Sequence, residues 1–212
     1  MLHHDRARRR FAICLAGLAG FVDAVGFLSA SGYFVSFMSG NTTRLAVALG
    51  TDPARALAPL LLILGFIAGV AIGALVVLRA GTWRKPALLL LVALLLLAAA
   101  AARAAGMPNL MLGAMVMAMG AINNTFQRDG EVAIGLTYMT GALVKLGQGL
   151  ALHITGRARP GWMLWGLLWA GLLAGAVLGA ALQDRLPMGC LWIAALWAFA
   201  MIPVALRLPS DS

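Results

Sequence analysis

Long apolar stretches dominate this chain and leave few folds open to it. Six of them cover residues 11–28, 57–78, 86–102, 110–126, 162–182 and 188–206. An α-helix needs about 17 to 25 residues to cross the roughly 30 Å of hydrocarbon in a bilayer. Because lipid offers the backbone no hydrogen-bond partners, each stretch is expected to be a helix. The sequence therefore predicts an all-α integral membrane protein with one membrane domain over residues 1–212.

The composition agrees with this class and excludes others. Hydrophobic residues make up 62% of the 212 residues and charged residues only 11%, whereas soluble domains carry about 25% charged residues. The net charge of +9 does not indicate nucleic-acid binding, because the cations gather at the ends of the apolar stretches. Cys14 and Cys190 lie inside apolar stretches and are expected to be small buried residues without a disulfide.

The placement of Lys and Arg predicts the topology. With six crossings and a cytoplasmic N-terminus, the cytoplasmic side receives the cations at 6–10, 79–85, 128, 157–159 and 207, and the outer side only Arg55, Arg103 and Arg185. This bias follows the positive-inside rule and places both termini in the cytoplasm. An alternative 4+4 arrangement has eight crossings, and it moves Arg79, Arg84 and Lys85 outside. The bias then weakens, so six crossings are preferred.

The second half of the chain repeats the first. A shift of 101 residues pairs Gly40 with Gly141, Asp23 with Asn124, Ser36 with Thr137, Ser39 with Thr140 and Arg44 with Lys145. Glycines 65, 69 and 73 are answered by glycines 171, 175 and 179. We expect two repeats, 11–102 and 107–206, and three crossings in each would give them opposite orientations. The glycine ladders predict close helix packing, either within the chain or between copies in a homo-oligomer.

Two polar segments interrupt the apolar pattern at residues 33–50 and 134–152. Each reads as extended chain, then turn and N-cap residues, then a short helix. Each segment can fold back as a re-entrant hairpin or cross the bilayer. Non-helical backbone survives at membrane depth only inside protein or beside a wet cavity. We therefore expect Ser39, Asn41, Thr42 and Thr140 to contribute to a solute site near the midplane, with a polar loop at the water interface as the alternative.

Three charged residues extend this candidate site. Arg44 and Lys145 lie early in the two short helices, where they are expected to hold an anionic solute, pair with Asp23, or reach to the lipid headgroups. Asp23 lies on a small-residue face of the first helix, and Asn124 is its counterpart in the second repeat. An ionisable group in a membrane helix is a candidate functional residue. It is interpreted either as a proton-coupling group, lost in Asp23→Asn, or as a structural ion-pair partner.

Enzymatic chemistry and bound cofactors are not expected. The spacing of His, Cys and carboxylates does not resemble a metal site. An intramembrane serine protease would need a histidine base near Ser39, and His153 lies in a different environment at the cytoplasmic edge. The sequence predicts no cofactor and no catalytic residue.

The stretch GFVDAVGFLSASGYFVSFMSGNT, residues 20–42, resembles the signature of the YoaK-type bacterial membrane proteins, a family of unknown function. The later block YMTGALVKLGQGL, residues 138–150, extends the resemblance over nearly the whole chain. The resemblance implies a small multi-pass protein of the bacterial inner membrane. Two hypotheses remain open: a transporter for a small solute, with an anion among the candidates, and a non-transporting assembly or partner-binding protein whose polar cluster is structural.

Overall fold

The chain folds into a helical bundle in which helices from the two halves pack against each other. The computed structural model describes residues 6–30, 32–128, 131–132, 135–157 and 160–208. Its α-helices are α1 (Arg6–Ser29), α2 (Met38–Thr51), α3 (Leu57–Ala80), α4 (Arg84–Ala104), α5 (Pro108–Ile122), α6 (Met139–Ile154), α7 (Met163–Arg185) and α8 (Cys190–Leu206). This confirms the all-α membrane class. A two-residue antiparallel ladder, β1 (Gln127–Arg128) with β2 (Glu131–Val132), was not anticipated.

Several helices have the length and composition of membrane spans. Within the described ranges, three helical runs qualify: Arg6–Ser29, Pro53–Ala104 and Met163–Arg185, and Cys190–Leu206 is a shorter apolar helix. The 52-residue run contains α3 and α4, which are joined through a 3-10 turn at Gly81–Trp83 where Gly81 has φ +52°. Of the apolar window in α1, 67% is buried within the protein, against 22% in α7. Helix α1 is therefore central, and much of α7 faces outward.

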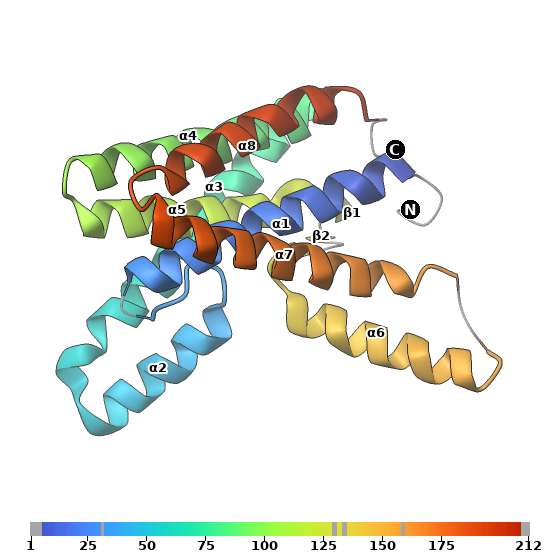
Figure 1. Ribbon diagram of the computed structural model, residues 1–212, viewed down its shortest axis with the longest axis horizontal. Helices are drawn as coiled ribbons and strands as arrows, with labels where there is room; N and C mark the ends of the chain where they lie inside the picture. The colour runs from blue at the N-terminus through green and yellow to red at the C-terminus, as the bar shows by residue number, and fades with distance from the viewer. Residues whose placement is uncertain (1–5, 31, 129–130, 133–134, 158–159, 209–212) are drawn as a thin grey trace.

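Helices of one half of the chain pack against helices of the other half, and glycines form these contacts. Gly175 of α7 lies against the backbone of Gly17 in α1, and Gly179 lies against Phe21. In the same way Gly69 of α3 lies against Met117 in α5, and Gly73 lies against Ala121. These contacts advance together along both helices of each pair, so α1 runs parallel to α7 and α3 runs parallel to α5. Helices α4 and α8 also pack together (Figure 1).

Both glycine ladders are thus used inside the chain. A Cβ on Gly73 would lie 2.9 Å from the Ala121 Cα, and one on Gly171 would lie 3.0 Å from the Ile13 carbonyl oxygen. The prediction that the ladders allow close helix packing is confirmed. The glycines of both ladders contact helices of the same chain. A homo-oligomer, the alternative use of the ladders, stays a prediction.

The short helices α2 and α6 are set apart from the bundle. In Figure 1 both begin toward the middle of the molecule and run to opposite ends. Helices α1, α4 and α7 run one way along the long axis of this view, and α3, α5 and α8 run the other way. The chain therefore returns to the same end after α2 and again after α6.

Two local predictions were wrong. Helix α2 begins at Met38 after Phe37, without a side-chain cap, so Ser39 to Thr42 lie within its first five residues and not in a turn before it. Cys14 is exposed on α1 while Cys190 is buried, and both are free thiols. An outward-facing position on a membrane helix meets lipid, which accommodates a small apolar side chain as readily as a protein core does.

Candidate functional site

Asp23 anchors the non-helical chain that precedes α2. Its carboxylate Oδ1 accepts hydrogen bonds from the backbone N–H of Val35 at 3.0 Å and of Ser36 at 2.8 Å. Val35 is fully buried against Gly26, where a Cβ would lie 2.6 Å from the Val35 Cγ1. The break in helical structure after α1 is therefore stabilised by a carboxylate six residues before the helix ends, about 9 Å along its axis.

Asn41 fixes the other end of this segment. From the first turn of α2, its side-chain Nδ2 donates to the Phe34 carbonyl at 2.7 Å and its Oδ1 accepts from the Phe34 N–H at 3.2 Å. The side chain is fully buried. One amide thus satisfies both backbone groups of a residue that has left regular structure, as buried polar groups require. Asn41 is a structural residue in this conformation.

In the second half of the chain, an asparagine bonds the non-helical segment that precedes α6. The Thr137 N–H donates to Asn123 Oδ1 at 3.3 Å, and Asn123 Nδ2 donates to Thr137 Oγ1 at 3.1 Å. Asn124 instead donates to the Val70 carbonyl of α3 at 3.0 Å. The expected counterpart of Asp23, Asn124, therefore does not make the bond that corresponds to Asp23–Ser36; Asn123 does. Ser36 and Thr137 both carry hydroxyls and are paired by the shift of 101 residues. This was the sequence feature that could have indicated the bond between Asn123 and Thr137.

The remaining candidate residues do not join these clusters. Ser39, Thr42 and Thr140 are exposed, and the Thr42 hydroxyl donates to the Met38 carbonyl of its own helix at 2.9 Å. The Arg44 guanidinium lies 5.0 Å from the Tyr33 ring centroid, and the Lys145 Nζ lies 4.0 Å from that of Trp165. Between Asp23 and either cation, all of which lie in the described part of the chain, there is no ion pair. Both cations are held by cation–π contacts.

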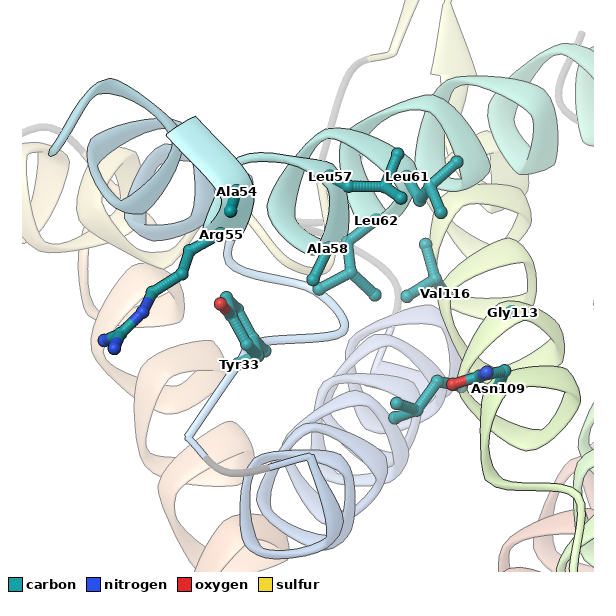
Figure 2. Close-up of a pocket in the computed structure, with 11 residues that line it drawn as sticks. Tyr33, Ala54, Arg55, Leu57, Ala58, Leu61, Leu62, Asn109, Gly113 and Val116 are labelled. Atoms are coloured by element: carbon teal, nitrogen blue, oxygen red, sulfur yellow. The ribbon is translucent and has the colours of Figure 1, made fainter. Parts of the chain in front are cut away.

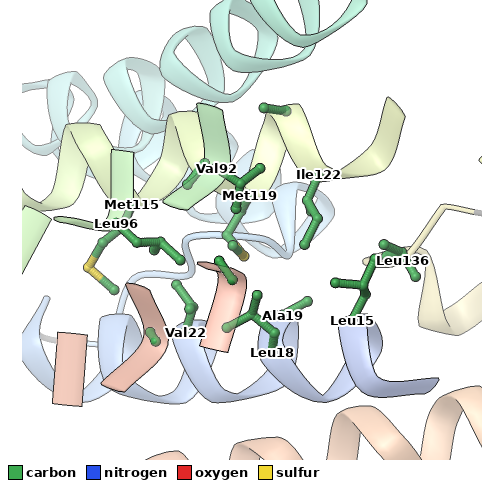
Figure 3. Packing of buried hydrophobic residues seen from close by; sticks show 14 of the residues in the cluster. Leu15, Leu18, Ala19, Val22, Val92, Leu96, Met115, Met119, Ile122 and Leu136 are labelled. Atoms are coloured by element: carbon green, nitrogen blue, oxygen red, sulfur yellow. The ribbon is translucent and has the colours of Figure 1, made fainter. Parts of the chain in front are cut away.

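An apolar core separates the two polar clusters. Figure 3 shows Leu15, Leu18 and Val22 of α1 facing Met115, Met119 and Ile122 of α5, with Leu136 at one end. Val35 and Leu136 are paired by the shift of 101 residues, and both are fully buried in this core. The conformation observed here therefore has a carboxylate site in one half and an amide site in the other, with hydrocarbon packed between them.

Asp23 also lines a pocket of about 290 Å³ between α1, α7 and the segment before α2. Around it, α1 contributes Gly20, Asp23, Ala24, Phe27 and Leu28, the linking segment contributes Phe34, and α7 contributes Leu172, Ala176 and Ala180. The small side chains at these positions of α1 and α7 leave the space open. None of the α7 residues was expected in the site, because the sequence does not show which helix covers the Asp23 face.

A larger pocket of about 610 Å³ lies on the other side of the non-helical segment, where Tyr33 meets the start of α3 and α5. Figure 2 shows the polar residues Tyr33 and Arg55 on one side and Asn109 on the other, with Leu62 and Val116 between them. Arg55 is paired with Asp52 at 2.9 Å, and its side chain is 80% exposed. Tyr33 and Phe34 are adjacent in sequence but line different pockets, so the segment that Asp23 anchors separates the two spaces.

No group of three or more His, Cys, Asp or Glu side chains able to hold a metal ion occurs in the described residues. His153 lies 5.7 Å from the Trp162 ring centroid, an aromatic contact at the end of α6.

Long apolar helices, glycine-mediated helix pairs and a carboxylate within a membrane helix define a multi-pass α-helical membrane protein. The family described as "Protein of unknown function (DUF1275)" matches residues 11–204, and the chain belongs to this family. It is 38% identical over 209 residues to UPF0700 transmembrane protein RA0705 of Rhizobium meliloti (strain 1021), covering 95% of this chain and 90% of that protein.

A second relative confirms the resemblance to YoaK-type proteins. UPF0700 transmembrane protein YoaK of Bacillus subtilis (strain 168) is 31% identical over 142 residues, which is 63% of this chain and 62% of YoaK. No solved structure matches the chain. The relatives are bacterial transmembrane proteins, which places the chain in a membrane.

Proposed function

We propose that this protein is a non-enzymatic transporter for a small solute in the bacterial inner membrane, with its solute site at Asp23. One observation carries the proposal: a carboxylate within a membrane helix holds a break in the backbone and also lines a pocket. Ionisable groups are costly in membrane helices and mark solute or proton pathways. Many secondary transporters build their solute site from broken helices beside a cavity.

We further propose that the chain contains two inverted repeats with six crossings, and that α2 and α6 are re-entrant. The opposite directions of α1 and α5, of α3 and α7, and of α4 and α8 support this arrangement (Figure 1). The exchanged pairs α1–α7 and α3–α5 also support it, since each joins the first crossing of one half to the second crossing of the other. The start of α1 and the end of α8 lie at the same end, in agreement with two cytoplasmic termini (Figure 1).

In this proposal the transport site belongs mainly to the first repeat. The observed conformation buries Val35 and Leu136 and separates the polar clusters. A transport cycle would therefore have to move the linking segments relative to the α1–α5 core. The two pockets on either side of residues 33–34 supply space for such a movement.

Water access tests the proposal. In a Cys14→Ala, Cys190→Ala background, Ala176→Cys places a thiol in the Asp23 pocket, while Ala174→Cys lies two residues away on the exposed face of α7. We expect membrane-impermeant thiol reagents to label Ala176→Cys and to leave the lipid-facing Ala174→Cys nearly unlabelled. If both thiols are labelled equally slowly in membranes, the pocket is dry, and a transport site there is contradicted.

A non-transporting assembly protein is the second candidate. It is favoured by the structural partners found for Asn41, Asn123 and Asn124, whose amides are bonded to the chain itself. It is also favoured by the exposed faces of α2 and α6, including Val47, Leu49, Val144 and Leu150. If Ala176→Cys stays unlabelled, the assembly function is favoured over transport. The polar cluster then serves only to pack the helices.

A further inference from the structure

The residues that line the pocket beside Asp23 limit the chemical class of ligand that it can bind. Asp23 is the one charged residue in its lining, and Phe27 and Phe34 are its aromatic walls, with ring centroids 5.0 Å apart. The other lining residues are glycine, alanine and leucine. Charge complementarity and aromatic surface therefore point to the same kind of ligand.

Among the described residues, no cationic side chain neutralises the Asp23 carboxylate. The N–H groups of Val35 and Ser36 solvate Asp23 Oδ1 but carry no net charge. Arg44 and Lys145 lie over aromatic rings and, within the described residues, form no ion pair with Asp23. Asp23 is only partly exposed, and a carboxylate with reduced hydration favours a counter-charge or a change of protonation. A ligand cation would supply that counter-charge.

The aromatic walls favour a cation as well. A cation near the face of a phenyl ring is attracted to its quadrupole, and the attraction grows when water is excluded. Arg44 already uses the Phe34 ring in this way, 5.9 Å from its centroid, although Arg44 is not part of the pocket lining. The anion expected from Arg44 and Lys145 has no comparable support, because neither cation lines this pocket.

We propose that the Asp23 pocket binds a small organic cation, specifically a protonated primary amine. Its ammonium hydrogens would donate to the Asp23 carboxylate and its alkyl part would contact Phe27, Phe34 and Ala176. A volume of about 290 Å³ lies at the lower end of the range for small-molecule sites, so the ligand has few non-hydrogen atoms. Bare Ca²⁺ or Mg²⁺ does not fit, because each takes six or more oxygen ligands.

This inference rests on the proposed function to the extent that water must reach the pocket, and it is tested with the same thiol. In the Ala176→Cys protein, reconstituted in lipid nanodiscs, labelling rates are measured for a trimethylammonioethyl and a sulfonatoethyl methanethiosulfonate. Each rate is divided by the reagent's rate with a free small thiol. We expect the cationic reagent to be favoured roughly tenfold, because a single nearby charge acts in opposite directions on the two reagents. Adding Asp23→Asn should remove the preference.

Protection by unlabelled probes tests binding without altering Asp23. Ethylammonium should slow the labelling of Ala176→Cys, whereas acetate and ethanol at the same concentration should not. If Ala176→Cys reacts no faster than Ala174→Cys, the water-filled pocket is absent, and the proposed function and this inference both fail. If it reacts with no charge preference, or is protected by acetate, the pocket is wet but the cation assignment is overturned.

Discussion

Individual polar side chains in this protein act mainly on the backbone around them. Asp23 and Asn41 between them bond the backbone of three consecutive residues, 34 to 36, in the segment where the helix is interrupted. Water inside a membrane protein is scarce, so an unbonded backbone group there costs free energy that only side chains can recover. The non-helical segment therefore requires Asp23 and Asn41, whatever ligand the site binds.

Replacing Asn41 with alanine is expected to destabilise the protein. The change leaves the N–H and the carbonyl of Phe34 without their bonds to the buried amide, at about 1–3 kcal/mol for each group. The melting temperature of purified protein in detergent measures the loss. Thr43→Ala is the control, since that hydroxyl is exposed and, among the residues described, bonds only the Ser39 carbonyl of its own helix. Equal melting temperatures for Asn41→Ala and the wild type would contradict the structural role.

Two substitutions separate the effect of the Asp23 hydrogen bonds on stability from the effect of its charge. Asp23→Asn keeps an acceptor oxygen for the Val35 and Ser36 N–H groups, so we expect a small change in melting temperature. Asp23→Leu keeps similar bulk but leaves both donors unbonded, and it should lower the free energy of unfolding by about 2–6 kcal/mol. Similar losses in both variants would mean that the charge, and not the acceptor, stabilises the segment.

The helices show what the sequence can and cannot specify. Apolar length and glycine spacing predicted the long helices and their close packing, because both are properties of one helix. The partner of each glycine ladder was not predictable, since Gly175 meets Gly17 only through the path of the whole chain. The exchange of roles between Asn123 and Asn124 was missed for a similar reason: a shift of one residue in a 3-10 turn, Asn123–Thr125, decides which amide faces Thr137.

Glycine substitutions should separate crowded helix contacts from open ones. Gly175→Ala places a methyl group against the Gly17 backbone, and overpacking of this kind costs about 1–3 kcal/mol or more. Gly147→Ala, in α6, has no atom within 4 Å of the new Cβ and should stabilise the helix by about 0.5–1 kcal/mol. Thermal unfolding in detergent compares the two. A stable Gly175→Ala protein would show that α1 and α7 do not pack as described.

The molecule as a whole poses the question of six or eight crossings, and two loops answer it. Ala54 follows α2, and Thr82 follows α3; both are exposed. With a cytoplasmic N-terminus, six crossings place Ala54 outside and Thr82 inside, whereas eight crossings reverse both positions. Single cysteines at these sites are labelled in intact cells with an impermeant reagent, after which lysed cells are labelled as a reference. We expect Ala54→Cys to react in intact cells and Thr82→Cys only after lysis.

The pairing of α1 with α7 also sets the order in which the protein can be completed. Helix α1 is synthesised first, yet its glycine-matched partner begins at Met163, about 130 residues after α1 ends. At about 5–20 residues per second, a ribosome needs roughly 7 to 26 s to deliver that partner. During this interval the face of α1 that carries Gly17, Gly20 and Asp23 is uncovered. The cell's insertion machinery or surrounding lipid must hold a carboxylate-bearing helix until translation is nearly finished, and truncated products that end before α7 would retain that unfinished surface.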